Sequence, residues 1–186
     1  MWCAAGAGAG LALALAMAGP GHSPFLFASL GGSAVFLFGL GNAPAAQPRA
    51  LFRGHLGSAL IGIACAQHLG SGAWVYALAQ ALTLVFMITC RTVHPPAGAN
   101  AMIMVHAHAG YGALLQPVLI GVICLAGSAF LWSRLWSGAV HYPVSWRAGS
   151  RPVDWGSQAC GIDEQYGHDV ALKGVTAAEV ARRSAP

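Results

Sequence analysis

The sequence predicts an all-α fold, that of a polytopic helical membrane protein. Of its 186 residues, 56% are hydrophobic and 8% are charged, whereas soluble domains carry about 25% charged residues. Three long stretches contain no charged residue at all: residues 1–48, 54–90 and 92–133. This composition excludes a soluble globule and a disordered chain. It indicates one transmembrane domain over residues 1–134 and a polar, mostly irregular cytoplasmic tail over 135–186.

Five apolar runs are predicted to form clear spanning helices. In chain order they cover residues 2–19, 24–40, 55–69, 73–90 and 112–132. Crossing the hydrocarbon core takes about 20 helical residues, so the third run is short. The first run has an alternative interpretation as a signal peptide, because small residues precede its end, but it lacks a basic start.

Residues 92–110 are predicted to form a sixth, proline-broken pass. The prolines of His94-Pro95-Pro96 remove two backbone donors and disfavour helix in the residue before them. The chain should therefore run extended to Pro95 and begin a helix near Pro96 or Ala97. The apolar helical part would be roughly 14 Å long, too short to span alone. A proline-capped turn at the membrane interface is the alternative.

The arginines predict the orientation of these passes. Arg49 and Arg53 follow the second run, Arg91 the fourth and Arg134 the last. The positive-inside rule then places both termini, the 42–54 loop and Arg91 in the cytoplasm, which requires six passes. Two halves of three passes would make a 3+3 inverted repeat, for which short sequence echoes between the halves give weak support.

The polar residues of the membrane part favour a small monovalent anion as the ligand. Residues 1–153 contain six arginines and no carboxylate, so an acidic site for a cation is absent from this part. The helix after the prolines would direct free amides and the positive end of its dipole at an anion. The predicted substrate-binding residues are His94, Pro95, Pro96, Gly98, Ala99, Asn100, Ser33 and Gly32.

Arg91, Arg49 and His55 are expected to attract or gate the anion. Histidine titrates near neutral pH, so His55 or His94 could couple proton movement to the anion, or each could simply cap a helix end. No metal site, cofactor or nucleic-acid contact is expected, because the histidines lack carboxylate or cysteine partners and the arginines are dispersed. No nucleophile arrangement typical of an enzyme is visible.

Residues 91–101, RTVHPPAGANA, closely resemble the signature of the HPP family of integral membrane proteins. Three further segments resemble motifs of that family in the same order: Gly32 to Val35, Ala46 to Arg49 and Gly54 to Ala59. The likeness extends over about residues 5–146. The chain departs from the family pattern in having Asn100 where Thr is common and Gly32 where Ala is usual.

The resemblance implies a helical membrane protein, usually described with four spans. It also implies nitrite as the anion, because chloroplast and cyanobacterial members are regarded as nitrite transporters. We therefore expect a nitrite transporter or channel in a bacterial inner membrane or a plastid envelope. The alternative is a non-transporting scaffold or regulatory protein whose HPP turn is structural. Small residues spaced four apart would allow a homo-oligomer or merely internal packing.

Overall fold

The computed structural model describes residues 1–18, 27–135 and 141–150. Over these residues the chain forms six α-helices and no strands, which confirms the all-helical prediction. In chain order the helices are α1 (Trp2–Met17), α2 (Ala28–Gly39), α3 (Pro48–Leu69), α4 (Ala73–Thr89), α5 (Pro95–His106) and α6 (Ile120–Trp132). Residues Met1–Ser150 make up one compact unit, and Arg151–Pro186 are a second unit outside the described residues.

The helices differ in whether they could cross a bilayer. Within the described ranges, one continuous segment is both long and apolar enough, Tyr111–Trp132 with 22 residues. It contains two short turns, η3 (Tyr111–Leu114) and η4 (Leu115–Leu119), followed by α6. Helices α1, α2 and α4 are apolar but shorter. Of the five predicted spans, one segment thus has the length and hydropathy of a membrane-spanning helix, and the other four stay predictions.

Helix α3 begins earlier than the sequence indicated. It was expected to start at about residue 55, whereas the structure starts it at Pro48. Proline suits the first helical position because its φ is fixed near the helical value. Arg49 and Arg53 consequently lie in the first turns of α3 and not in a loop. Charged residues interrupt an apolar run in the sequence. They do not interrupt the helix, because arginine is a good helix former.

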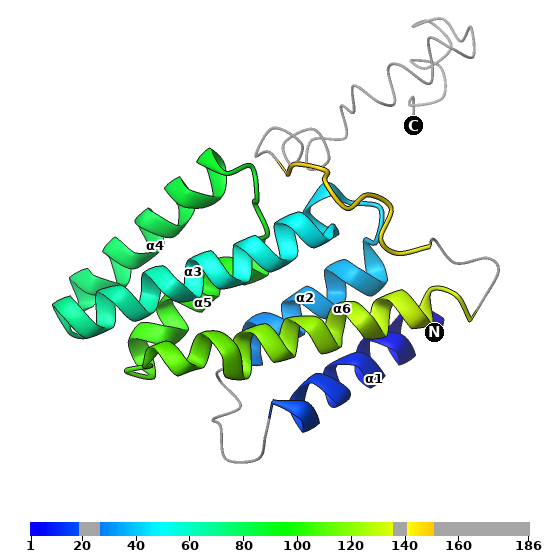
Figure 1. Ribbon diagram of the computed structural model, residues 1–186, viewed down its shortest axis with the longest axis horizontal. Coiled ribbons are helices and arrows are strands. Elements are labelled where there is room, and N and C mark those ends of the chain that lie inside the picture. The colour runs from blue at the N-terminus through cyan, green and yellow to red at the C-terminus, as the bar shows by residue number, and fades with distance from the viewer. Residues whose placement is uncertain (19–26, 136–140, 151–186) are drawn as a thin grey trace, which may run out of the picture. The chain divides into compact units, whose positions relative to one another are not determined.

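Of the segments that the arginines placed on one side of the membrane, the N-terminus and the start of α3 lie toward the same end of the bundle (Figure 1). The rings of Trp2 in α1 and Trp132 in α6 lie 4.5 Å apart at this end. The side-chain oxygen of Gln47, just before α3, accepts hydrogen bonds from the backbone N–H groups of Val144 and Ser145. Which side of the membrane this end faces stays a prediction, as does the tail's location.

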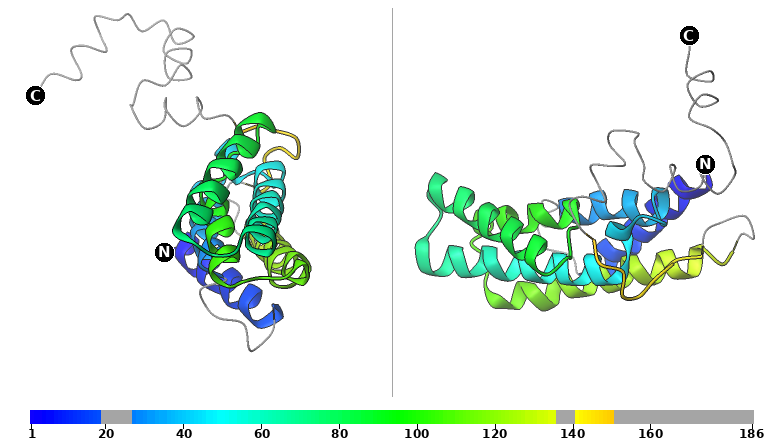
Figure 2. Two further views of the ribbon diagram at one scale, coloured as in Figure 1. Left: turned by 90° about the vertical axis from the view of Figure 1, so that its left-hand side faces the viewer. Right: turned by 90° about the horizontal axis from the view of Figure 1, so that it is seen from above.

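Helix α5 lies among α2, α3 and α4 and follows an extended residue. His94 has φ −134° and ψ 98°, and the helix begins at Pro95, slightly earlier than expected. With 12 residues, α5 is roughly 18 Å long. The left view of Figure 2 shows α1, in blue, below α3, in cyan, and α4, in green. Helices α2 and α5 both have 12 residues, but the inverted repeat itself stays a prediction.

The tight crossing of α3 and α5 depends on small residues. A Cβ atom on Gly62 would overlap the backbone of Ala101, and one on Gly54 would lie 3.2 Å from the Cβ of His94. Between these glycines, the Ser58 hydroxyl donates to the Ala97 carbonyl over 2.6 Å. The small residues of this face of α3 therefore serve internal packing.

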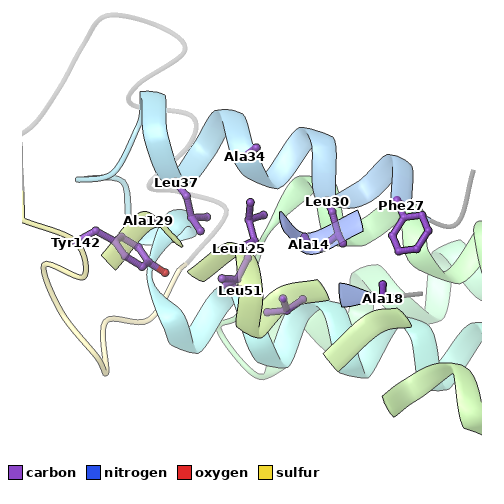
Figure 3. Close-up of a cluster of buried hydrophobic side chains, with 11 residues drawn as sticks. Ala14, Ala18, Phe27, Leu30, Ala34, Leu37, Leu51, Leu125, Ala129 and Tyr142 are labelled. Carbon is purple, nitrogen blue, oxygen red and sulfur yellow. The ribbon is translucent and has the colours of Figure 1, made fainter. Parts of the chain in front are cut away.

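A separate apolar core joins α1, α2 and α6 to the start of α3 (Figure 3). Leu30 and Leu37 of α2 meet Leu125 of α6 and Leu51 of α3, all at most 3% exposed. Tyr142, from the segment after α6, is 2% exposed against this core. The core fixes α2 relative to α3, and that spacing determines where the polar side chains described next can meet.

Candidate functional site

Four polar side chains from different parts of the chain meet beside the start of α5. They are Ser33 of α2, His55 of α3, His94 of the extended segment and Asn100 of α5, and each is at most 1% exposed. We call these four residues the histidine cluster. All four were among the residues that the sequence predicted for the site, and the structure brings them together.

The Ser33 hydroxyl joins the two imidazoles of the cluster. Its oxygen lies 2.8 Å from Nε2 of His55 and 2.8 Å from Nε2 of His94. The same oxygen lies 2.9 Å from the backbone carbonyl of Ser29, one turn earlier in α2. A buried polar group needs such partners, because an unpaired one costs about 1–3 kcal/mol. Ser33 therefore connects α2 to both α3 and α5.

The two histidines are also held at their other ring nitrogens. Nδ1 of His94 lies 2.7 Å from the carbonyl oxygen of Ala45, in the short turn η2 (Pro44–Ala46). Nδ1 of His55 lies 2.9 Å from the side-chain nitrogen of Asn100. Phe36 packs edge-on against the His94 ring at 5.5 Å. Both rings are thus oriented at each nitrogen, which defines one arrangement of the cluster.

Asn100 supports His55 and does not offer free donors. Its amide nitrogen lies within hydrogen-bond distance of both Nδ1 and the backbone carbonyl of His55, at 2.9 and 3.2 Å. Its side-chain oxygen is buried without a hydrogen-bond partner. An acceptor of this kind suits a water molecule or another donor, because an anion cannot donate to it.

The prediction of free amides at the start of α5 needs a correction for two of the three residues that it named. Because the helix begins at Pro95, the amides of Ala99 and Asn100 fall where carbonyls within the helix accept them. The two prolines have no N–H, and the Ala97 N–H donates to the His94 carbonyl over 3.0 Å. The helix start therefore contributes the positive end of its dipole and few free donors.

The remaining predicted binding residues lie around the cluster. A Cβ on Gly32 would lie 3.0 Å from Pro96, so this glycine lets α2 approach the double proline. Pro95 and Ala99 are exposed on the outer face of α5. Gly98 is half-buried and faces α4, where a Cβ would lie 3.6 Å from the side-chain nitrogen of Gln80.

Sequence reasoning missed two polar residues of α4. Gln80 faces Gly98, and Thr83 is fully buried with its hydroxyl lacking a hydrogen-bond partner. Both can donate to a ligand. The signal that could have found them is a pair of polar residues three apart in an otherwise uncharged apolar helix, which places both on one side of α4.

The arginines lie at the end of the bundle. The Arg49 guanidinium donates to the carbonyls of Cys90 and Arg147, at 3.1 and 3.4 Å, and so ties α3 to the end of α4 and to the segment after α6. Arg91 is exposed, with its backbone in the left-handed region at φ 54°. Its carbonyl accepts the Ser150 N–H over 2.9 Å. Attraction of an anion by Arg91 stays a prediction.

The chemistry available to the cluster is that of uncharged hydrogen-bonding groups inside an apolar bundle. Over the three ranges that the structure describes, no three histidine, cysteine or acidic side chains gather to hold a metal ion. Two imidazoles joined through one hydroxyl can exchange protons and can also donate to an anion once protonated. In this conformation the cluster is closed to solvent.

Comparison with known proteins agrees with the membrane assignment. The family model of the HPP transmembrane region matches residues 1–143. Two proteins of Dictyostelium discoideum, both described as transmembrane proteins, are similar to the chain: one is 33% identical over 130 residues and the other 31% over 129. The matches cover 66% and 65% of this chain but 42% and 45% of the relatives, so the chain spans less than half of their length. No solved structure matches the chain.

Proposed function

This chain belongs to the HPP transmembrane family, and from that premise we propose that it is a transporter or channel for a small monovalent anion, nitrite first among them. The observation that carries the proposal is the histidine cluster, a buried set of uncharged polar groups in a part of the chain without carboxylates. Cation carriers place acidic side chains at such depth, and residues 1–153 contain none.

Three features near the cluster suit a small anion. The positive end of the α5 dipole points toward His94, which precedes the helix. Gln80 of α4, an exposed residue, adds side-chain donors next to Gly98, and Thr83 adds a buried hydroxyl inside the bundle. A flat ion such as nitrite needs few donors to replace its water. We therefore place its binding site between the start of α5 and α4.

Passage of the anion requires a change of conformation. The cluster side chains are at most 1% exposed, so the described arrangement is a closed one. Helix α5 is the element we expect to move, because it is short and lies inside the bundle between α2, α3 and α4. Alternating opening of such a discontinuous helix is the general plan of many transporters.

Nitrite uptake into proteoliposomes containing the purified protein tests the proposal. Nitrite should enter, and nitrate, formate and chloride should compete in an order that identifies the preferred anion. Gly98→Val fills the space in front of Gln80 and should slow uptake by about tenfold or more. Gly127→Val in α6 is the matched control, because a Cβ there meets nothing within 4 Å.

Lack of flux for every small anion in a folded preparation would contradict the proposal. It would favour the alternative of a membrane scaffold or regulatory protein in which the HPP turn is structural. Equal slowing by Gly98→Val and Gly127→Val would contradict the placement of the anion beside Gly98.

A further inference from the structure

The contacts of Ser33 restrict where protons can lie in the histidine cluster. A hydroxyl carries one proton and accepts up to two hydrogen bonds, and a carbonyl only accepts. The contact of Ser33 with the Ser29 carbonyl at 2.9 Å therefore uses the single Ser33 proton. While that bond is formed, both imidazoles, at 2.8 Å from the same oxygen, donate to it from Nε2–H; when the Ser33 proton is given to Nε2 of one histidine instead, that nitrogen accepts.

The other ring nitrogens decide the charge of each histidine. Nδ1 of His94 faces the Ala45 carbonyl at 2.7 Å, so this nitrogen also carries a proton. Nδ1 of His55 faces an amide nitrogen of Asn100, and the contact of that nitrogen with the His55 carbonyl identifies it as the NH₂ group. Nδ1 of His55 is therefore an acceptor. Two neutral histidines fit every contact except the bond from Ser33 to the Ser29 carbonyl. The full set of contacts fits a neutral His55 together with a cationic His94, so His94 is the histidine that can take either charge in this arrangement.

We infer that His94 is the proton-binding residue of the site and that it takes up one proton together with each transported anion. This inference rests on the proposed function and names its coupling ion. When His94 is neutral, the Ser33 hydroxyl turns from the Ser29 carbonyl to Nε2 of His94, and no heavy atom has to move. The Ser29 carbonyl keeps the backbone bond from Ser33 that a helix provides.

The surroundings of His94 lack a built-in counter-charge. From α2 it is faced by Ser33 and Phe36, from η2 by the Ala45 carbonyl, and from α3 by Gly54 and the neutral His55. Of these groups only His55 is titratable. A buried cation without a partner is costly, by several kcal/mol, and residues 1–153 contain no carboxylate.

The counter-charge must therefore arrive with the ligand. A monovalent anion supplies one negative charge. The positive end of the α5 dipole attracts this anion, and at the same place it repels an imidazolium that has no anion beside it. Proton and anion thus stabilise each other, which is reciprocal linkage. The proton comes from water on one side, binds Nε2 of His94 and leaves to water on the other side. No bond within the anion changes, and the net charge moved is zero.

Nitrogen-15 NMR of histidine-labelled protein in lipid nanodiscs reads the protonation of His94 directly. Signals are assigned by their loss in His94→Gln and in His55→Gln, and pH is varied from about 8 to about 5, around the ordinary imidazole value of about 6.5. We expect His94 to gain a second N–H and His55 to keep one N–H, on Nε2. At a fixed pH, nitrite should raise the doubly protonated fraction of His94 at least threefold. Titration of His55 in place of His94, or no response of His94 to nitrite, would overturn the inference.

Asn100→Asp is a second variant that keeps the inference testable. The new carboxylate faces Nδ1 of His55, so His55 should gain the second N–H without nitrite. With a negative charge already in the site, nitrite should no longer raise the doubly protonated fraction of His94. A response to nitrite that persists unchanged in this variant would contradict the role of the anion as counter-charge.

Proteoliposome flux separates this inference from the proposed function. An inward proton gradient should drive nitrite uptake, and a membrane potential alone should not, because the pair is neutral. Nitrite flux that follows the potential and ignores the proton gradient would overturn the coupling and leave anion transport standing. Absence of both flux and the NMR response would overturn both.

Discussion

The imidazole rings of His55 and His94 lie 5.3 Å apart, centre to centre, at an angle of 50°. One belongs to the middle of α3 and the other precedes α5, so the packing of these two helices sets the distance. Any change that separates α3 from α5 should therefore affect both the stability of the bundle and the hydrogen bonds of the cluster.

Gly62→Ala tests the close crossing of α3 and α5. The new Cβ would overlap the backbone of Ala101, and overpacking of this kind costs about 1–3 kcal/mol. We expect a lower midpoint of thermal unfolding in detergent. Gly8→Ala in α1 is the control, because a Cβ there meets nothing within 4 Å and alanine favours helix. Equal stability of the two variants would show that α3 and α5 are not in contact as described.

Arg91→Asn tests attraction of the anion by charge. Asparagine tolerates the left-handed backbone found at φ 54°, so the substitution removes the charge with little strain. We expect the half-saturating nitrite concentration to rise several-fold at low ionic strength. The difference should vanish at about 1 M salt, where screening acts within about 3 Å. A defect independent of salt would contradict the electrostatic role.

Asn100→Leu tests the support of His55. The substitution leaves Nδ1 of His55 without its partner at 2.9 Å and removes one of the donors to the His55 carbonyl, at 3.2 Å. An unpaired buried group costs about 1–3 kcal/mol. Both stability and nitrite uptake should fall. Met104→Leu, a volume-conserving change at a position that is also fully buried in α5, should cost less than about 1.5 kcal/mol. Similar losses in both variants would contradict a specific role of the amide.

Tyr142→Phe tests the packing of the segment after α6. Burial raises the pKa of the Tyr142 hydroxyl above its ordinary value, and its oxygen has no hydrogen-bond partner. Because the pKa of Tyr142 in the folded protein exceeds the unfolded value of about 10, its neutral hydroxyl costs the folded state nothing below about pH 10. Stability is then lost as the pH rises toward the folded pKa. The variant should match the wild type at pH 7 and lose less stability above about pH 10. Tyr111→Phe, at an exposed position, should leave the alkaline loss unchanged.

The sequence predicted much of the fold because apolar runs and breakers carry its signal. Helices α1, α4 and α5 lie close to their expected ranges. The start of α3 was missed because the third run was begun after Arg53, although arginine does not interrupt a helix. The bend at Gln116, with φ −134°, was missed because residues 112–132 were taken as one apolar run, although Pro117 disfavours helix in the residue before it.

The site was predicted in its residues and not in its contacts. Ser33, His55, His94 and Asn100 were singled out from separate segments, and the family resemblance helped to select them. Their mutual distances depend on the crossing of α2, α3 and α5, which periodicity does not reveal. The expected amide cradle is incomplete, because a start at Pro95 leaves two prolines, which have no N–H, in donor positions. Gln80 was missed because its role depends on the neighbouring glycine of another helix.

Nitrite uptake by the Ser33→Ala variant tests the central claim most directly. Ser33 joins both imidazoles, so its loss should slow uptake by about tenfold or more in protein that still folds. Ser128→Ala in α6 is the matched control, since that hydroxyl also donates to the carbonyl one turn earlier, over 2.7 Å. Uptake should stay near the wild-type rate in Ser128→Ala. Undiminished uptake in folded Ser33→Ala protein would contradict the account.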